Sequence, residues 1–248
     1  MAKAWLILEE LFCQMPRELA EDYDNVGLLA GSIMSEVSTV MCALDLNSRV
    51  IDEAVEAGAQ LIVTHHPILF RGRKNLCEDD PEGAMLAKLV RAKLALIAMH
   101  TNFDSTQEGV NDALACRLGI ENAQPLESGM RIGDIGPMEL AELAAHIENT
   151  LGGVVRRYGE AGRRVRRVAV MGGSGGSYAH FALEAGADVF VTGETGYHNA
   201  LDMYDRGLCV LEAGHAATEL PAIGLLAEKL RGLGLGLDVY VSAAETFR

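Results

Sequence analysis

The sequence predicts an α/β fold with two similar halves and largely parallel sheets flanked by helices. Short apolar runs typical of buried strands alternate with segments of helical spacing along the chain. The motif Glu56-Ala-Gly-Ala59 recurs as Glu184-Ala-Gly-Ala187, and the same shift of 128 positions carries Val63-Thr64 onto Val191-Thr192. With 248 residues, 49% of them apolar, the chain can bury a large core in one broad domain or in two modest ones.

The elements of the first half follow from apolar spacing and from residues that begin or end helices. Pro16 ends the first helix. Asn47 and the pair Asp80-Pro81 begin two later helices, because Asn and Asp cap first-turn amides and proline suits the first helical position. Gly119 ends a fourth helix. The expected elements are a helix at 4–15, a strand at 37–44, a helix to about 56, a strand at 60–64, a helix to about 91, a strand at 94–99 and a helix at 110–118.

The second half repeats this alternation after a join at 121–137 that is rich in proline and glycine. The predicted domains are therefore 1–125, which includes the N-terminal helix, and 126–248, with the candidate site between them. Pro221 fits only the first turn of a helix, so the last helix is expected to begin near Thr218. The expected elements are a helix at 137–151, a strand at 165–171, a helix at 178–184, a strand at 188–192, a helix at 197–204, a strand at 208–211, a helix to about 230 and a strand at 237–241.

Charge and cysteine usage narrow the class of protein. The net charge of −14 opposes electrostatic binding to nucleic acid or to anionic membranes. The five cysteines are scattered and lack C-x-x-C spacing, so neither a disulfide framework nor a thiolate zinc site is expected. No apolar run is long enough for a membrane span, and the N-terminus lacks the features of a signal peptide. We expect a reduced cytoplasmic protein.

Histidines and acids follow the predicted strands. Ligands in such sheets gather at the carboxyl ends of the strands. The sequence therefore predicts a site at those ends, and the residues that fall there are His65, His66, His100, Glu194 and His215.

A His-x-x-x-acid spacing occurs twice, as His100 with Asp104 and as His215 with Glu219, and a shift of 115 positions relates the two pairs. The spacing brings both groups onto one side of a helical segment. With the adjacent His-His pair that follows the strand at 60–64, the chain offers six candidate ligands, enough for two metal ions. Imidazole and carboxylate suit zinc, iron, manganese or nickel, and a pair of such ions can activate water for hydrolysis.

Each histidine alone also has a structural explanation, because single histidines are more often hydrogen-bonded core or surface residues than ligands. The repeated arrangement at strand ends favours the metal site. His146 and His180 lie within helical patterns and are taken as ordinary residues. His198, four residues after Glu194, is expected to contact the ligands or the substrate.

Two further segments have alternative explanations. The glycine-rich stretch 171–176 lies between a strand and a helix, where the amides of Gly173, Ser174 and Gly175 could hold a phosphate. A sharp turn explains these glycines equally well. The chain also has one strongly basic cluster, which comprises Arg156, Arg157, Arg163, Arg164, Arg166 and Arg167. We favour the explanation that it is a solvated loop and strand edge; the alternative is that it attracts an anionic substrate or partner.

Taken together, several motifs resemble the family named for Ngg-one interacting factor three, many members of which are labelled GTP cyclohydrolase 1 type 2 homologues. The matching segments cover nearly the whole chain and follow the family order. They are Asp24-Asn25-Val-Gly-Leu28, Thr64-His-His-Pro67, His100-Thr-Asn-Phe-Asp104, Thr192-Gly-Glu194 with His198, and Gly214-His-Ala-Ala-Thr-Glu219.

The resemblance implies two interlinked α/β halves, a ring-shaped homohexamer and a short form without the domain that some members insert between the halves. It also implies two divalent metal ions per chain, with iron or zinc expected and manganese or nickel as alternatives. His100 would be a further ligand or would support one, and Asp24 and Asn25 would lie near the ligands or the substrate. The implied metal ligands are His65, His66, Asp104, His215 and Glu219.

Three functions remain open at this stage. The first is a metal-dependent hydrolase acting on a nucleotide or pterin-like small molecule, with Glu194 or His100 as general base or acid. The second is a non-enzymatic metal-handling or adaptor protein. The third is an assembly in which the metal ions only stabilise the fold.

Overall fold

The computed structural model describes residues 1–244, which form two compact units. Unit 1 comprises Met1–Thr106 together with 223–244, and unit 2 comprises Gln107–Ala222. These boundaries differ from the predicted halves, because the chain leaves unit 1 earlier and its last strand returns to the sheet of unit 1. Both units combine helices with parallel strands, so the predicted α/β class is confirmed. Within residues 1–244, no helix is long and apolar enough to cross a membrane.

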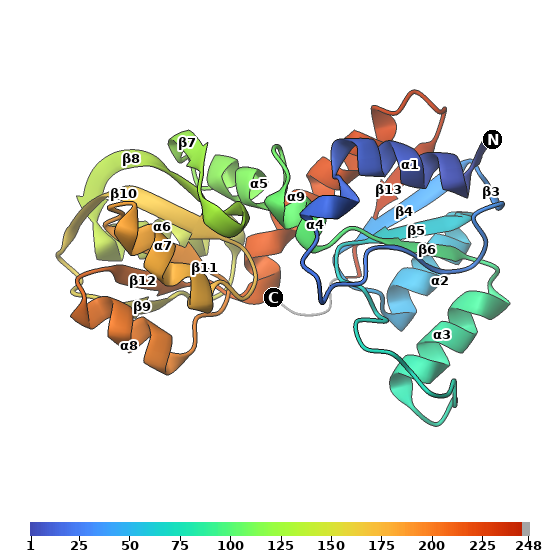
Figure 1. The fold of residues 1–248 in the computed structure, drawn as a ribbon, viewed down its shortest axis with the longest axis horizontal. Coiled ribbons are helices and arrows are strands. Elements are labelled where there is room, and N and C mark those ends of the chain that lie inside the picture. Colours follow the sequence, from blue (N-terminus) through green and yellow to red (C-terminus); the bar gives the residue numbers. More distant parts are fainter. Residues whose placement is uncertain (245–248) are drawn as a thin grey trace. The chain divides into compact units, whose positions relative to one another are not determined.

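Unit 1 contains a five-stranded sheet with helices around it (Figure 1). Its elements are β1 (Ala2–Lys3), α1 (Ala4–Gln14), the 3-10 helix η1 (Arg17–Leu19), β2 (Gly27–Ala30), β3 (Glu36–Val37), β4 (Thr39–Ala43), α2 (Ser48–Glu56), β5 (Leu61–Thr64), α3 (Pro81–Arg91), β6 (Ala95–Ala98), α4 (Thr101–Ser105) and β13 (Asp238–Val241).

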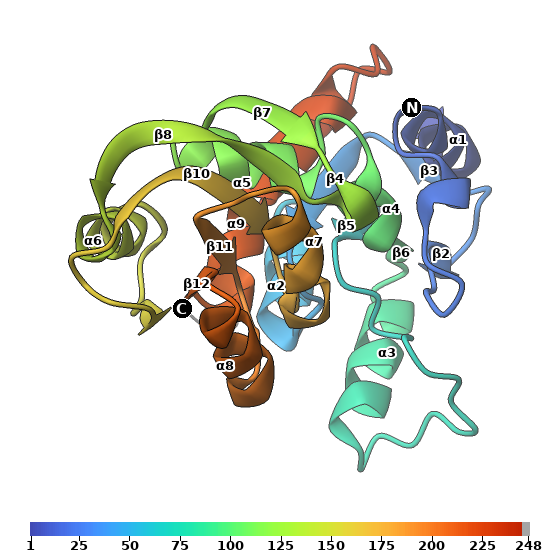
Figure 2. The same cartoon turned by 60° about the vertical axis from the view of Figure 1, so that its left-hand side comes forward.

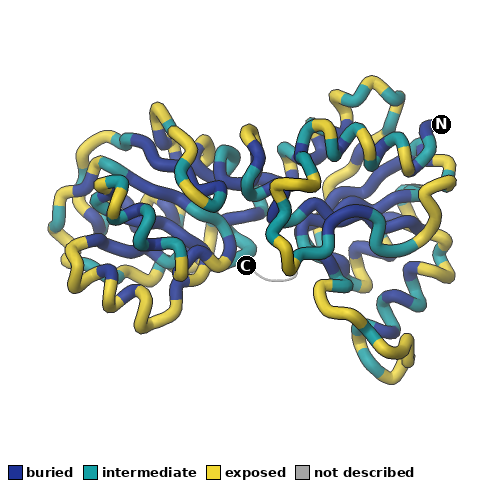
Figure 3. The backbone as a smooth tube through the Cα atoms, in the orientation of Figure 1, coloured by how far each residue is buried: buried dark blue, intermediate teal, exposed yellow. Residues whose placement is uncertain are grey.

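The strand order in this sheet is β13-β4-β5-β6-β2, with parallel pairing from β13 to β6 and an antiparallel edge strand β2. Every residue of β4, β5 and β6 is buried (Figure 3), as expected for parallel strands covered on both faces. Met41, Ile62 and Leu96 belong to one apolar cluster with residues of α2 and α3. These two helices lie on one side of the sheet and α1 on the other (Figure 1).

The helix starts in unit 1 confirm the capping predictions. The Asn47 side chain accepts hydrogen bonds from the amides of Arg49 and Val50 at 2.9 and 3.0 Å. Asp80 accepts one from the amide of Gly83 at 3.1 Å, with Pro81 as the first helical residue. Both contacts satisfy first-turn amides that the helix itself leaves without a partner.

Unit 2 contains a six-stranded mixed sheet, best followed in Figure 2. Its elements are α5 (Val110–Arg117), β7 (Glu121–Pro125), η2 (Glu127–Gly129), β8 (Arg131–Glu139), α6 (Leu140–Leu151), β9 (Arg156–Tyr158), β10 (Arg164–Met171), η3 (Gly176–Tyr178), α7 (Ala179–Glu184), β11 (Val189–Thr192), α8 (Tyr197–Asp205) and β12 (Cys209–Glu212); α9 (His215–Arg231) begins in unit 2 and continues into the residues of unit 1.

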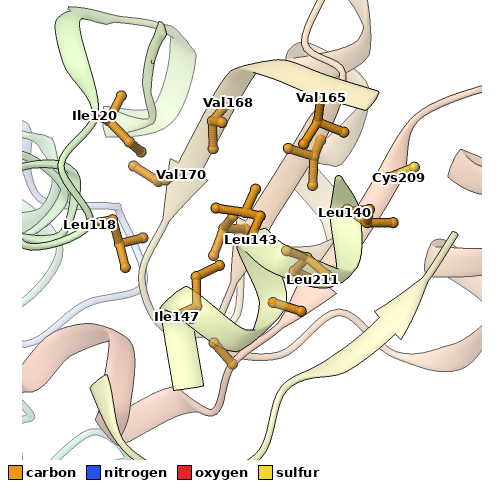
Figure 4. Close-up of a cluster of buried hydrophobic side chains, with 14 of the residues drawn as sticks. Leu118, Ile120, Leu140, Leu143, Ile147, Val165, Val168, Val170, Cys209 and Leu211 are labelled. Carbon is orange, nitrogen blue, oxygen red and sulfur yellow. The ribbon is translucent and has the colours of Figure 1, made fainter. Parts of the chain in front are cut away.

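The centre of this sheet is the parallel trio β10-β11-β12, and β8, β7 and β9 add antiparallel strands at its edges. Side chains alternate between its faces. Val168, Val189 and Leu211 pack in a cluster with α5 and α6 (Figure 4), whereas Phe190 and Val210 pack with α7 and α8. The trio matches β4-β5-β6 of unit 1 in strand order, and β11 lies 128 positions after β5. The repeat found in the sequence is therefore a repeat of strands.

The predicted join at 121–137 is wrong, because its residues form the antiparallel pair β7 and β8. β8 extends to Glu139, so Pro137 belongs to a strand and the next helix begins at Leu140. Long-range pairing of β8 with β10 outweighs the local turn preference of the glycines. A Cβ at Gly133 would lie 2.5 Å from the Glu121 carbonyl oxygen, so glycine permits this close approach of the two strands.

The last helix also begins earlier than predicted, at His215 rather than near Thr218. The amide of Thr218 already donates a helical hydrogen bond to the Gly214 carbonyl at 3.2 Å. Pro221 therefore lies inside α9, where its missing N–H removes one intrahelical bond without ending the helix.

Candidate metal centre

Three histidines form a cluster at the carboxyl ends of β5 and β6 in unit 1. His65 and His66 follow β5, and His100 follows β6, whose register places Ala98 opposite Thr64. The ring centroids are 4.9 Å apart for His65 and His66, 5.1 Å for His65 and His100, and 5.5 Å for His66 and His100. One nitrogen of each ring lies within 4.8 Å of the other two. The three predicted residues are thus brought together closely enough that they could hold a metal ion.

The Nδ1 atom of each ring meets a hydrogen-bond acceptor. The partners are the Met99 carbonyl for His65 at 2.9 Å, Asp45 for His66 at 2.8 Å and Asp24 for His100 at 2.8 Å. Because a carbonyl or carboxylate oxygen accepts the proton of Nδ1, the lone pair of a neutral ring is on Nε2. Such partners orient metal-binding histidines and raise their basicity.

Asp104 lies in the short helix α4, one turn after His100. Its Oδ1 is 3.6 Å from Nε2 of His65, so the helical segment brings a carboxylate to the histidine cluster. The acid of this His-x-x-x-acid pair, Asp104, therefore points toward His65 at the end of the neighbouring strand β5.

Asp24 anchors the His100 ring from a side chain without solvent exposure. Burial by itself raises the pKa of this carboxyl group, but hydrogen bonds from His100 and from Thr101 outweigh it and hold the pKa well below its usual range. The neighbouring Asn25 donates its side-chain amide to the Leu69 carbonyl at 2.7 Å. Asp24 thus supports a candidate ligand, and Asn25 holds the loop that follows the histidine pair.

The second His-x-x-x-acid pair lies on the first turn of α9 in unit 2. His215 Nε2 is 3.2 Å from Oε1 of Glu219, and its Nδ1 is 3.3 Å from Oε2 of Glu194. The Glu219 side chain is 5% exposed, whereas that of Glu194 is 60% exposed. A buried carboxylate and an imidazole on one helical face are suitable metal ligands, and Glu194 adds an exposed carboxylate beside the imidazole.

The glycine-rich loop 171–176 packs against this pair. Its amides already donate within unit 2: Gly173 to Thr218 at 3.1 Å and Gly175 to Thr192 at 3.0 Å. The structural explanation, a sharp turn between β10 and α7, therefore accounts for these glycines better than a phosphate site that includes Ser174. Gly173 has a φ of +62°, and a Cβ there would lie 2.3 Å from Oε1 of Glu219. Its lack of a side chain makes room for the buried carboxylate.

The remaining sequence candidates lie at the surface of unit 2. His198 is exposed on α8, with its ring 5.3 Å from that of Tyr197. Arg156 in the edge strand β9 pairs with Glu212 at 2.7 Å, and Arg167 lies 3.6 Å from Asp134. Arg156 and Arg157 lie in the edge strand β9, as the structural explanation favoured. Arg164, Arg166 and Arg167 instead begin the interior strand β10.

Asp45 is a candidate functional residue that the sequence analysis missed. It follows β4 at the same sheet edge as the histidines, and it accepts from His66. The signal was its position directly after the predicted strand at 37–44, which is where the histidines were found on the next strands.

Replacing Asp45 with alanine is expected to weaken metal binding by roughly 10- to 100-fold, because His66 loses the acceptor that orients its ring. Competitive zinc titration against a chromophoric chelator measures this change. The matched control is Asp79→Ala, which removes one exposed negative charge from unit 1 and should leave the affinity unchanged. Equal affinities of the two variants would show that Asp45 does not support a ligand.

The fold and these two ligand sets define a class of protein, an α/β protein with candidate divalent-metal ligands at strand ends. The comparisons with known proteins give the family. The sequence model of Duf34/NIF3 (NGG1p interacting factor 3) matches residues 4–246. The chain belongs to this family, as its motifs predicted.

Three relatives illustrate the similarity. A GTP cyclohydrolase 1 type 2 homolog of Clostridium acetobutylicum is 33% identical over 242 residues, which cover 92% of this chain and 90% of the relative. A hypothetical protein of Staphylococcus aureus has a TM-score of 0.92 at 29% identity and covers 99% of this chain and 98% of its own. A Bacillus cereus protein related to NIF3 has a TM-score of 0.94 at 23% identity, with 100% and 98% covered, and supports the fold alone.

Proposed function

We propose that this protein is a metal-dependent hydrolase that acts on a nucleotide or pterin-like small molecule. The observation that carries the proposal is the histidine cluster of unit 1, in which all three Nδ1 atoms meet acceptors and one nitrogen of each ring lies within 4.8 Å of the others. The substrate class comes from relatives that are named GTP cyclohydrolase 1 type 2 homolog.

The proposed centre is dinuclear, as the family resemblance implies. The resemblance leaves the role of His100 open, and we assign it as a sixth ligand. Imidazole and carboxylate oxygen fit iron or zinc, with manganese or nickel as alternatives. The proposed ligands are His65, His66, Asp104, His215 and Glu219. When bound, two such ions supply Lewis-acid activation of water and of the bond to be cleaved.

The protein's own residues then have separate roles. His100, fixed by Asp24 and close to the other two histidines, is better suited to hold metal than to move a proton. Glu194 is the exposed carboxylate beside His215, and we assign it the general-base role. Asp45 and Asp24 keep the imidazole rings in the tautomer that binds metal.

Metal analysis by mass spectrometry on untagged protein purified without chelator tests the proposal. About two equivalents per chain are expected in the wild type, and roughly one or fewer in His66→Ala and in Glu219→Ala. His180→Ala is the control, because His180 lies half-buried on α7 outside the proposed ligand set, with its ring beside the Ser177 carbonyl and the Phe181 ring. Metal content near zero that added ions do not restore, or content unchanged in both variants, would contradict the metal site.

A panel of nucleotides and pterins then tests the reaction. Metal-dependent turnover that Glu194→Gln abolishes without loss of metal supports the hydrolase. Loaded protein that turns over nothing but transfers its metal to an acceptor would instead support the metal-handling function. We also propose the homohexamer implied by the family motifs, which light scattering after size exclusion measures directly.

A further inference from the structure

A cleft of about 520 Å³ lies in the loop that follows the adjacent histidines of unit 1. It is lined by Ile68 and residues 70–75 of this loop and by Glu82 of α3. Three of the lining side chains are cationic, Arg71, Arg73 and Lys74, and one is anionic. In a chain with a net charge of −14, such a local excess of positive charge favours an anionic ligand.

The anionic side chain of the cleft is already paired. Arg73 donates to Glu82 at 2.5 Å and also to Asp80, so this arginine serves to hold the loop against α3. Arg71 and Lys74 are exposed, and neither makes an ion pair or a side-chain hydrogen bond with any residue in 1–244. The positive charge that remains for a ligand is therefore on Arg71 and Lys74.

Phe70 connects the cleft with the histidine cluster. It lines the cleft, its ring centroid is 6.0 Å from that of His100 and 6.1 Å from that of Tyr23, and it is 43% exposed. The hydrogen bond from Asn25 to the Leu69 carbonyl holds this part of the loop. One exposed aromatic ring thus lies between the cationic residues and the candidate metal ligands.

We propose that this cleft binds the phosphate groups of a nucleotide-like substrate. Arg71 and Lys74 contact the phosphate oxygens through charge-assisted hydrogen bonds, and the base stacks on Phe70. The inference rests on the proposed function, since it assigns the phosphate-binding place for that substrate. It replaces the glycine-rich loop, whose amides at Gly173 and Gly175 are used within unit 2.

Calorimetric titration of inorganic tripolyphosphate into the metal-free full-length chain tests the phosphate contacts without the metal ions. The double variant Arg71→Ala/Lys74→Ala is expected to bind at least about tenfold more weakly. The matched control is Arg17→Ala/Arg49→Ala, which removes two exposed cations outside the cleft and should keep wild-type affinity. Absence of binding to the wild type, or equal loss in both double variants, would overturn the proposal.

Titration of GTP tests the contact with the base, because GTP carries a base in addition to a triphosphate and tripolyphosphate does not. Phe70→Ala is expected to weaken GTP by at least about tenfold while leaving tripolyphosphate unchanged; equal binding of GTP by the variant and the wild type would overturn the stacking contact. Metal analysis of the same samples keeps this test apart from that of the proposed function. If the purified chain proves unable to hold metal but still binds tripolyphosphate through Arg71 and Lys74, the hydrolase proposal fails and the phosphate-binding cleft is supported.

Discussion

Removal of the proposed metal ions with a chelator is expected to lower the melting temperature of the wild-type chain by roughly 8 to 16 °C. A ligand at a concentration of about 1,000 times its Kd stabilises the folded state by about 4 kcal/mol, and each kcal/mol shifts a chain of this size by about 2–4 °C. The stabilisation arises because the imidazole nitrogens and the Asp104 carboxylate are held close together only in the folded unit 1.

Differential scanning calorimetry with and without added zinc measures this shift. His66→Ala is the informative variant. The His66 side chain is partly exposed, so its removal should leave the metal-free protein folded. Its zinc-dependent shift is expected to fall well below that of the wild type, whereas His180→Ala keeps the full shift. If zinc raised the melting temperature of His66→Ala as much as that of the wild type, the histidine cluster would not be the metal site.

The elements with local signals could be predicted from the sequence. Asn47 and Asp80 cap their helices through contacts within three residues, and such contacts depend only on neighbouring sequence. Continuous apolar runs located β5 and β11, because strands buried on both faces carry no polar alternation. The histidines were found by their position after these strands.

The elements that depend on distant pairing could not be predicted. β8 is a strand because it pairs with β10, although its glycines and Pro137 locally favour turns. β13 was expected as a strand, but only its pairing with β4, almost 200 positions earlier, assigns it to unit 1. No local pattern specifies such a partner, because strand propensity reflects the neighbours that a strand packs against.

The same distinction applies to the candidate site. The residues that resemble ligands were predicted, because histidines and acids at strand ends are visible in the sequence. Their supporting contacts were less visible: Asp45 accepts from a histidine 21 positions away, and the glycine-loop amides donate to Thr192 and Thr218 of later elements. A glycine-rich turn looks the same in sequence whether its amides serve a phosphate or the protein itself.

Gly193 is a position in unit 2 where one added methyl group is expected to have a large structural effect. A Cβ at this residue would lie 2.5 Å from the Gly173 carbonyl oxygen and 2.7 Å from the Cα of His215. Both contacts are with backbone, so the end of β11 would have to move away from the glycine-rich loop and from the start of α9. Gly193→Ala is expected to lower the free energy of unfolding by about 3 kcal/mol, the upper part of the usual range for overpacking.

Urea denaturation of the full-length chain measures this loss. The matched control is Gly162→Ala, because a Cβ at Gly162 meets no atom within 4 Å, and its free energy of unfolding should stay within about 0.5 kcal/mol of the wild type. Gly193 lies between the Gly173 carbonyl and the backbone of His215, so the added methyl group would also displace His215 and the loop beside Glu219. The folded fraction of Gly193→Ala is therefore expected to retain less metal than the wild type. If Gly193→Ala had the same urea midpoint of unfolding as the wild type, β11, the glycine-rich loop and α9 would not be packed as tightly as described.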